Sequence, residues 1–191
     1  MRVVAFNGSA RKAGNTTILL EAVLDELKAE GIATELVQLA GKALGGCIAC
    51  YKCFENKNFK CAVDKDEMNT YIQKMLDADG VLLGSPTYFS DVTANMKALI
   101  ERCGMVARAN DDMFRRKVGA AVVAVRRAGA THVFSSINYF FLIGQMIVPG
   151  SSYWNLAIGR NPGDVRDDAE GMQTMANLGK NVAWLMKKLH E

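Results

Sequence analysis

The sequence predicts an α/β protein in which five parallel strands form one sheet with helices on both sides, a three-layer, doubly wound arrangement with strand order 2-1-3-4-5. Short apolar runs alternate with segments of helical periodicity along the whole chain. Two of these runs, at 80–84 and 118–125, are continuously apolar, as in parallel strands buried on both faces. Right-handed crossovers leave few arrangements of five such strands. We expect residues 1–191 to form a single domain.

The first half of the chain alternates strand, helix, strand, helix, strand. Residues 2–7 are a short apolar run, and from Thr16 apolar residues recur on one helical face that stops at Gly31. Residues 34–39 alternate between apolar and polar, which is typical of a strand. Asp66 is a good helix cap, so we expect a helix from there to about 77, before the strand at 80–84.

The second half continues the same alternation. A helix is expected at about 93–103, followed by the apolar strand 118–125 and a helix at about 131–147. A strand at 152–158 and a helix at about 167–189 complete the sheet and its cover. Between the second strand and second helix lies a cysteine-rich loop at about 45–63. A loop this long in a small domain needs a function or a ligand to order it.

Composition and charge exclude several classes of protein. The net charge is +3 and no long Lys/Arg run occurs, so a nucleic-acid partner is not expected. The longest apolar stretch, near 137–148, contains Asn138, Gly144 and Gln145 and is too short for a bilayer, so no membrane partner is expected. The chain opens on a strand rather than a signal peptide, which predicts a cytoplasmic protein with reduced thiols.

Four cysteines, Cys47, Cys50, Cys53 and Cys61, form the pattern C-x2-C-x2-C-x7-C. Thiolates this close together suit a soft metal or an iron–sulfur cluster, whereas ordinary core packing does not require them. A zinc site and metal-free thiols stay open as alternatives. The fifth cysteine, Cys103, lies in a helical pattern and is expected in the core.

The loop after the first strand has the composition of an anion site. It leaves a strand and enters a helix, so backbone N–H groups and the helix dipole favour a negative ligand there. Side chains able to contribute are Ser9, Arg11, Asn15, Thr16 and Thr17, around Gly14. The loop has neither Gly-Lys-Ser/Thr nor G-x-G-x-x-G, so we expect a monophosphate rather than a dinucleotide.

Two further loops should meet it at the carboxyl ends of the strands. After the third strand, Pro86 fixes the backbone, Thr87 can donate a hydrogen bond, and Tyr88 and Phe89 offer flat faces to a flat ligand. After the fourth strand come Arg126, Arg127 and, further on, His132. The arginines are either solvated or face a phosphate, a nicotinamide cofactor or a partner subunit. His132 is expected as a capping or surface residue, with a proton donor as the alternative.

Together these motifs resemble the flavodoxin-like NADPH-dependent FMN reductases, and among them the iron–sulfur flavoprotein family. The segments that match are Gly8-Ser9-x-Arg11-x-x-Gly14-Asn15-Thr16, Gly84-Ser85-Pro86-Thr87-Tyr88-Phe89 with Val92-Thr93-x-x-Met96-Lys97, and the cysteine set. The resemblance implies FMN, its phosphate on the first loop and its ring bordered by Pro86, Thr87, Tyr88, Phe89, Ala128 and Gly129. It implies a four-iron, four-sulfur cluster on Cys47, Cys50, Cys53 and Cys61. The chain departs from the family at Ala128 and Gly129, where two glycines are more usual.

The expected function is that of an FMN-dependent oxidoreductase or electron-transfer flavoprotein, with electrons relayed between the cluster and FMN and exchanged with a carrier such as ferredoxin. Without a cluster, an NAD(P)H-dependent FMN or quinone reductase is the alternative. A non-enzymatic flavodoxin-type carrier is less consistent with a positive net charge. No catalytic side chain is expected, because the flavin carries the chemistry. A homodimer or homotetramer is expected, and the apolar segment 137–143 is either a core helix or a subunit contact.

Overall fold

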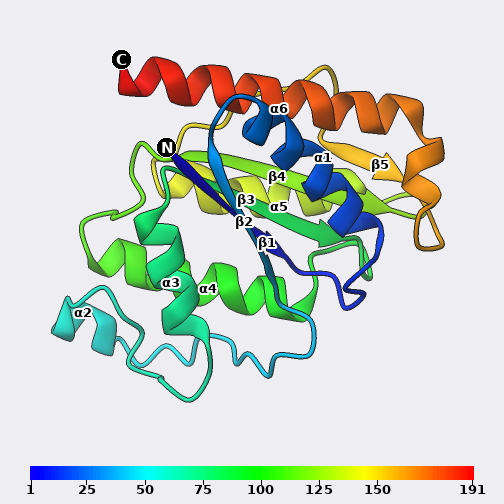
Figure 1. Cartoon of the computed structure of the whole chain (residues 1–191). Helices are drawn as coiled ribbons and strands as arrows, with labels where there is room; N and C mark the ends of the chain where they lie inside the picture. Colours follow the sequence, from blue (N-terminus) through cyan, green and yellow to red (C-terminus); the bar gives the residue numbers. More distant parts are fainter.

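Five parallel strands form one sheet in the computed structural model, which describes all 191 residues (Figure 1). The order β2-β1-β3-β4-β5 confirms the predicted arrangement. The strands are β1 (Arg2–Asn7), β2 (Ala33–Gln38), β3 (Gly80–Pro86), β4 (Val118–Val125) and β5 (Leu156–Ile158). Because β1 pairs with both β2 and β3, the winding direction reverses there, and the carboxyl ends of these strands diverge into loops.

Helices cover both faces of the sheet, α1 and α6 on one and α3, α4 and α5 on the other (Figure 1). A short helix, α2, lies apart from the sheet beside α4. Their bounds are α1 (Asn15–Ala29), α2 (Lys52–Asn56), α3 (Met68–Asp77), α4 (Ala94–Ala109), α5 (Ala130–Ile143) and α6 (Ala169–His190), with a 3-10 turn, η1 (Asp164–Asp167), before α6. None of the helices has the combination of length and hydropathy that a bilayer span requires.

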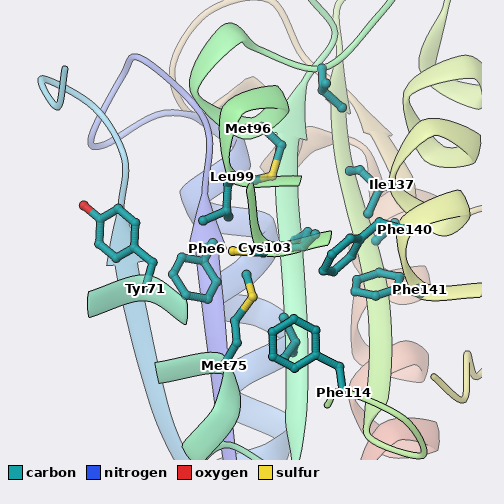
Figure 2. Packing of buried hydrophobic residues seen from close by; sticks show 14 of the residues in the cluster. Phe6, Tyr71, Met75, Met96, Leu99, Cys103, Phe114, Ile137, Phe140 and Phe141 are labelled. Carbon is teal, nitrogen blue, oxygen red and sulfur yellow. The ribbon is translucent and has the colours of Figure 1, made fainter. Parts of the chain in front are cut away.

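Alternate residues of the central strands feed two separate hydrophobic clusters. On β1, Val4 and Phe6 join the cluster under α3, α4 and α5, whereas Val3 and Ala5 join the one under α1 and α6. Figure 2 shows the first cluster, in which Phe6 meets Tyr71 of α3 edge to face at a centroid distance of 5.7 Å. Cys103 of α4 lies fully buried in the same cluster, which confirms its predicted place in the core.

Several boundaries differ from the sequence prediction. α4 continues six residues beyond Cys103, because Gly104 sits inside the helix against Phe140 rather than ending it. α5 ends at Ile143 instead of 147, since Gln145 adopts a left-handed conformation (φ 56°) and breaks the helical run. The short helix α2 within the cysteine-rich loop was not predicted.

The last strand is also shorter than predicted, and a bulge explains why. Ile147 pairs beside Val118 and Leu156 beside Val123, so β4 advances five residues while the edge chain advances nine. The segment 148–155, called the bulge below, leaves the sheet with four residues more than β4 has there (nine less five), and it is fastened to α6. Asn177 Nδ2 donates to Ser152 Oγ (2.9 Å) and Asn181 Nδ2 to Gly150 O (2.8 Å). Such a bulge interrupts an otherwise exposed sheet edge.

Candidate functional site

A cavity of about 280 Å³ opens at the carboxyl ends of β1, β3, β4 and β5. This is the position that the doubly wound topology predicts for a ligand. Its wall consists of Ser9, Arg11, Asn15, Thr16, Pro86, Thr87, Tyr88, Ala124, Val125, Arg126, Gly159 and Arg160. The wall contains three arginines and no carboxylate, so the cavity favours an anion.

The first loop is folded by its own side chains into a compact turn. The Ser9 amide donates to Asn7 Oδ1 (2.9 Å), and Ser9 Oγ accepts from the Arg11 amide (3.1 Å). Helix α1 then starts behind Gly14, which offers no side-chain cap to the amides of the first turn. These amides need an acceptor from outside the helix, which an anionic ligand can supply.

Two threonine hydroxyls at this cavity are buried without a partner. Thr16, in the first turn of α1, is 1% exposed, and its Oγ1 makes no hydrogen bond. The Oγ1 of Thr87, at the end of β3, is likewise buried and unpartnered. Because an unpaired buried hydroxyl costs free energy, two of them at one cavity indicate positions completed by a ligand.

The loop after β5 supplies part of the cavity wall that was not predicted from the sequence. A side chain at Gly159 would collide with Asn15, its Cβ lying 2.8 Å from Nδ2. Asn15 Oδ1 in turn accepts from the Gly163 amide (2.8 Å), so this residue ties the last loop to the first. Arg11 Nη1 reaches the carbonyl of Arg160 across the cavity (3.3 Å). Gly159 and Arg160 directly follow β5, and this position could have identified them from the sequence, because ligands bind at the carboxyl ends of strands.

The loop after β3 makes a tight reversal. The backbones of Tyr88 and Asp91 exchange two hydrogen bonds, of 2.9 and 3.1 Å, and both residues between them are left-handed (Phe89 φ 46°, Ser90 φ 65°). This is the backbone of a type I′ turn, which normally selects glycine or asparagine. Phe89 projects fully into solvent, and Gly129 (φ 88°) packs against Thr87 and Ser90.

Seven of the twelve predicted cofactor residues are therefore brought together at the cavity wall. The other five, Gly14, Thr17, Phe89, Ala128 and Gly129, are not among its lining residues. Thr17 is occupied by the loop itself, because its Oγ1 donates to Lys12 O (2.6 Å) and accepts from Asn7 Nδ2 (2.8 Å). Both arginines after β4 are exposed, and of the two only Arg126 lines the cavity. His132 is also exposed, with Nε2 3.6 Å from Asp91 Oδ2.

The four predicted cysteine ligands line one small cavity of about 20 Å³ beside α4. All are free thiols. No three His, Cys, Asp or Glu side chains are grouped so that they could hold one metal ion. A zinc ion needs four ligands around a single point, whereas a cluster distributes its ligands over several iron atoms. The four side chains therefore do not form a single-ion site as they stand.

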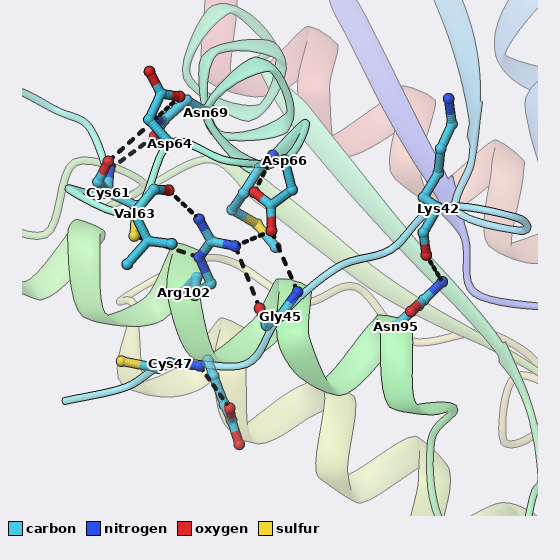
Figure 3. A network of polar contacts seen from close by, with 12 residues as sticks. Lys42, Gly45, Cys47, Cys61, Val63, Asp64, Asp66, Asn69, Asn95 and Arg102 are labelled. Atoms are coloured by element: carbon cyan, nitrogen blue, oxygen red, sulfur yellow. Dashed lines mark hydrogen bonds and ion pairs between the residues drawn. The ribbon is translucent and has the colours of Figure 1, made fainter.

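Helix α4 contacts three of the four cysteines, two of which, Cys47 and Cys61, are labelled in Figure 3. The Cys47 amide donates to Glu101 Oε2 (3.2 Å), Arg102 Nε donates to Cys61 Sγ (3.3 Å), and Cys53 Sγ lies 3.9 Å from Met105 O. Burial raises the pKa of the Cys53 thiol, so without a metal this side chain stays protonated.

Backbone strain is concentrated in the same segment. Of the ten non-glycine residues with positive φ in the chain, four lie here: Ala49, Tyr51, Lys57 and Phe59. Each such conformation costs free energy and persists only where surrounding contacts enforce it, which is common at functional sites.

The largest cavity of the molecule, about 620 Å³, lies elsewhere, between α5 and the bulge at 148–155. Its wall includes Phe134, Tyr139, Tyr153 and Trp154, and it has no charged side chain. The arginine-walled cavity at the strand ends is smaller, but it combines the topology and the chemistry expected of an anion site.

A comparison with protein families agrees with this geometry. Residues 1–161 match the model of the NADPH-dependent FMN reductases. The chain belongs to this family. It is 40% identical over 194 residues to an iron–sulfur flavoprotein of Methanocaldococcus jannaschii, with 98% of each chain covered. It is 31% identical to an iron–sulfur flavoprotein of Methanosarcina thermophila, covering 100% of this chain and 98% of the relative.

Solved structures with similar folds include RosB and an archaeal flavodoxin. RosB superposes with a TM-score of 0.76 at 17% identity, over 100% of this chain and 80% of its own. The flavodoxin superposes with a TM-score of 0.63 at 16% identity, over 98% and 99% of the two chains. These likenesses establish the flavodoxin-like fold, as predicted.

The donor chemistry of the residues suits both groups expected from the sequence, although the thiol-lined cavity, at about 20 Å³, is too small to enclose a cluster as it stands. For FMN, the cavity at the strand ends provides arginines, the open N-terminus of α1 and two unpartnered hydroxyls. For an iron–sulfur cluster, four thiols share one cavity whose wall is otherwise mostly apolar, and a guanidinium donates to one of the sulfurs.

Proposed function

We propose that this member of the family is an FMN-dependent electron-transfer oxidoreductase that carries a four-iron, four-sulfur cluster on Cys47, Cys50, Cys53 and Cys61. The observation that supports it most is the presence of two separate sites on one reductase chain. One is an arginine-walled cavity at the strand ends, and the other is a cavity lined by four free thiols.

At the first site, we propose that Ser9, Asn15, Thr16 and the first turn of α1 hold the flavin phosphate, with Arg11 balancing its charge. Gly14 and Thr17 act by shaping this loop. Thr87 offers its free hydroxyl to the ring, and Tyr88 offers a flat face. Pro86, Phe89, Ala128 and Gly129 shape the border of the ring site. FMN supplies hydride and single-electron chemistry when bound, so no side-chain acid or base is assigned.

At the second site, the four cysteines are the ligands, and a cluster there supplies single-electron exchange. The two sites lie toward opposite ends of α4. Its N-cap Thr93 donates to the carbonyl of Gly8 beside the first loop (2.8 Å). Arg102 follows nine residues later, about 13 Å along the helix. The donor is NAD(P)H or a ferredoxin-like carrier, and the acceptor is a small molecule or a protein.

We propose that the chain works as a homodimer or homotetramer in the cytoplasm. The outer face of α5 exposes Tyr139, Leu142 and Ile143 to between 61% and 68%, although Ile137 and Phe141 on its inner face are fully buried. The inner face is part of the core, and the outer face is free for the proposed subunit contact. A cluster of exposed apolar side chains supports a subunit contact, and five free cysteines suit a reducing compartment.

The test is purification without oxygen, followed by analysis of iron, sulfide, zinc and FMN per chain. The proposal predicts FMN together with about four iron atoms and four sulfides, as the cluster type requires. Cys61→Ser should lower the iron content, whereas Cys103→Ala, which changes the buried core cysteine, should not. Zinc in place of iron, or full iron retention in Cys61→Ser, would refute the cluster assignment.

A second candidate is an NAD(P)H-dependent FMN or quinone reductase that works without a cluster. The match to the NADPH-dependent FMN reductase model favours it. FMN without iron, combined with steady-state oxidation of NAD(P)H, would select this function. A flavodoxin-type carrier would bind FMN but would not turn over NAD(P)H.

A further inference from the structure

Arg102 of α4 is the largest fully buried side chain in the molecule, and its chain position gave no sign of a functional role. A guanidinium stays charged, and burying it is unfavourable unless its donors are matched by acceptors. An apolar residue would serve ordinary core packing better. The reason for an arginine here therefore lies in what its donors contact.

Every partner of this guanidinium belongs to the cysteine segment or to its two ends (Figure 3). Nη1 donates to Gly45 O (3.3 Å) and to Asp66 Oδ2 (2.5 Å), and Nη2 donates to Val63 O (2.5 Å). Nε donates to Cys61 Sγ (3.3 Å). One planar side chain thus joins the beginning of the segment, its last cysteine and its end to α4.

Neighbouring groups also hold the two ends of residues 45–66 together and against α4. Asp66 Oδ2 also accepts from the Gly45 amide (3.3 Å), so the two ends of the segment are bonded directly. Asn69 clamps Cys61 from the other side, accepting from its amide (2.8 Å) and donating to its carbonyl (3.0 Å). Next to Arg102 on α4, Glu101 holds the amide of Cys47. The first and last cysteines are therefore fixed to adjacent residues of one helix.

The contact with sulfur has its own chemical meaning. A thiol is a weak hydrogen-bond acceptor, whereas a thiolate or a metal-bound sulfur is a good partner for a cationic donor. Arg102 is the charged group that points at one of the four sulfurs, and the rest of that cavity wall is mostly apolar. A donor held in this way would stabilise negative charge on Cys61 and on any group that it ligates.

We propose that Arg102 is a positioning residue for the cysteine site: it closes residues 45–66 onto α4, so that the segment carrying the thiols is folded onto the helix before any metal arrives, and donates to the Cys61 sulfur. The proposal rests on the assignment of these cysteines as ligands in the proposed function. It extends that assignment by making the closure of this segment onto α4 a property of the apo chain.

The test compares the full-length wild type with Arg102→Met and Arg102→Lys, first in the cluster-free form. Methionine keeps a long side chain but no donor, whereas lysine keeps the charge and loses the planar fork and the Nε donor. Arg108→Met is the matched control, because it removes an exposed ion pair (2.6 Å to Asp112) from the same helix. The readouts are the amide hydrogen exchange of each peptide of the chain, measured by mass spectrometry, and the rate at which iodoacetamide alkylates each cysteine.

In Arg102→Met we expect amide exchange in residues 45–66 to rise about tenfold or more, with Cys61 alkylated faster and the sheet and FMN affinity unchanged. Arg102→Lys should restore part of this protection. After reconstitution with iron and sulfide, its cluster should have a more negative reduction potential than the wild type, because the donor to sulfur is gone. Arg108→Met should match the wild type in every readout.

The proposal would be overturned if Arg102→Met showed the same hydrogen exchange and the same Cys61 reactivity as the wild type. The donor role would be overturned if the cluster of Arg102→Lys had an unchanged reduction potential. If both Arg102 variants unfold entirely, Asp66→Asn decides. This variant removes the anion at the closure but leaves Arg102 and its Nε donor, so wild-type protection of 45–66 would then overturn the closure. If the wild type takes up no iron, the proposed function is wrong. Hydrogen exchange and alkylation of the cluster-free protein still test whether Arg102 holds residues 45–66 on α4.

Discussion

Two neighbouring threonines in the first turn of α1 have opposite roles. The hydroxyl of Thr16 is buried without a partner, whereas that of Thr17 is satisfied on both sides by Lys12 and Asn7. The sequence presents them as equivalent residues of an anion loop. Only the structure separates a hydroxyl that is left free for the proposed ligand from one that braces the loop.

Thr16→Val should stabilise the flavin-free protein by about 1 kcal/mol, because it removes an unpaired buried hydroxyl at constant shape. The same change should weaken FMN binding by about tenfold or more, since a hydrogen bond to a charged phosphate is lost. Thermal unfolding and a fluorescence titration measure the two effects. Thr17→Val, the adjacent control, should instead lower stability. Equal stability effects in the two variants would contradict this assignment.

Asn15→Asp should weaken FMN binding by placing a carboxylate at the anion site. The substitution keeps an oxygen that can accept from the Gly163 amide, so the tie to the last loop is retained. Riboflavin, which lacks the phosphate, should lose much less affinity, and added salt should reduce the difference. An equal loss for both flavins would show that the phosphate lies elsewhere.

At the level of elements, α4 connects the two candidate sites. Its N-cap Thr93 contacts the first loop, and its later turns fix Cys47, Cys53 and Cys61. The predicted helix ended at Cys103, two residues before its contact with Cys53. The extra turns could not be seen in the sequence, because Gly104 is a common stop signal and only its packing against Phe140 explains why the helix continues.

The closure of the cysteine segment should depend on acid. Burial acts to raise the pKa of Asp66, but hydrogen bonds from Arg102 and from the Met68 and Gly45 amides outweigh it and lower the pKa below its ordinary 3.8. A carboxyl whose pKa is lower in the folded than in the unfolded state stabilises the fold at a pH above its unfolded-state pKa. This stabilisation is lost as the pH falls through the folded-state pKa.

Cluster-free protein should therefore lose protection in residues 45–66 as the pH drops below about 4, before the sheet opens. Pulsed hydrogen exchange at a series of pH values measures this. Asp66→Asn should show the loosened segment at neutral pH and little further change with acid. A segment that opens only together with the sheet in the wild type would contradict the prediction.

On the scale of the whole molecule, exposed apolar side chains gather on the outer face of α5 and on the bulge at 148–155. Tyr139 and Leu142 belong to both the exposed face of α5 and the wall of the largest cavity, opposite Tyr153 and Trp154. Large contiguous apolar patches often mark protein–protein contacts, so these exposed side chains support the proposed assembly. The bulge, which the sequence did not predict, thus contributes exposed side chains to the surface proposed for the subunit contact.

Leu142→Lys should dissociate the assembly to monomers while leaving the fold intact, because it places a charge in an apolar contact without touching the core. Light scattering coupled to size-exclusion chromatography measures the mass. Trp184→Lys is the control, since Trp184 is equally exposed (63%) on α6, which covers the other face of the sheet. A monomeric wild type at all concentrations would contradict the predicted assembly.

The sequence by itself determined the strand order, the anion loop after β1 and the set of four cysteines. Each of these depends on local information: the alternation of apolar runs, the residues between a strand and a helix, and the spacing of one reactive side chain. Topology then fixes where such loops meet, because the carboxyl ends of parallel strands share one edge.

The tertiary structure alone decided which side chains complete the two sites. Arg102, Gly159 and Arg160 lie far along the chain from the residues they join, and Phe89 faces solvent because its turn is left-handed. Such roles arise from contacts between distant segments and from the burial of individual polar atoms. A local pattern contains neither, because the partners of a residue are chosen only when the chain has folded.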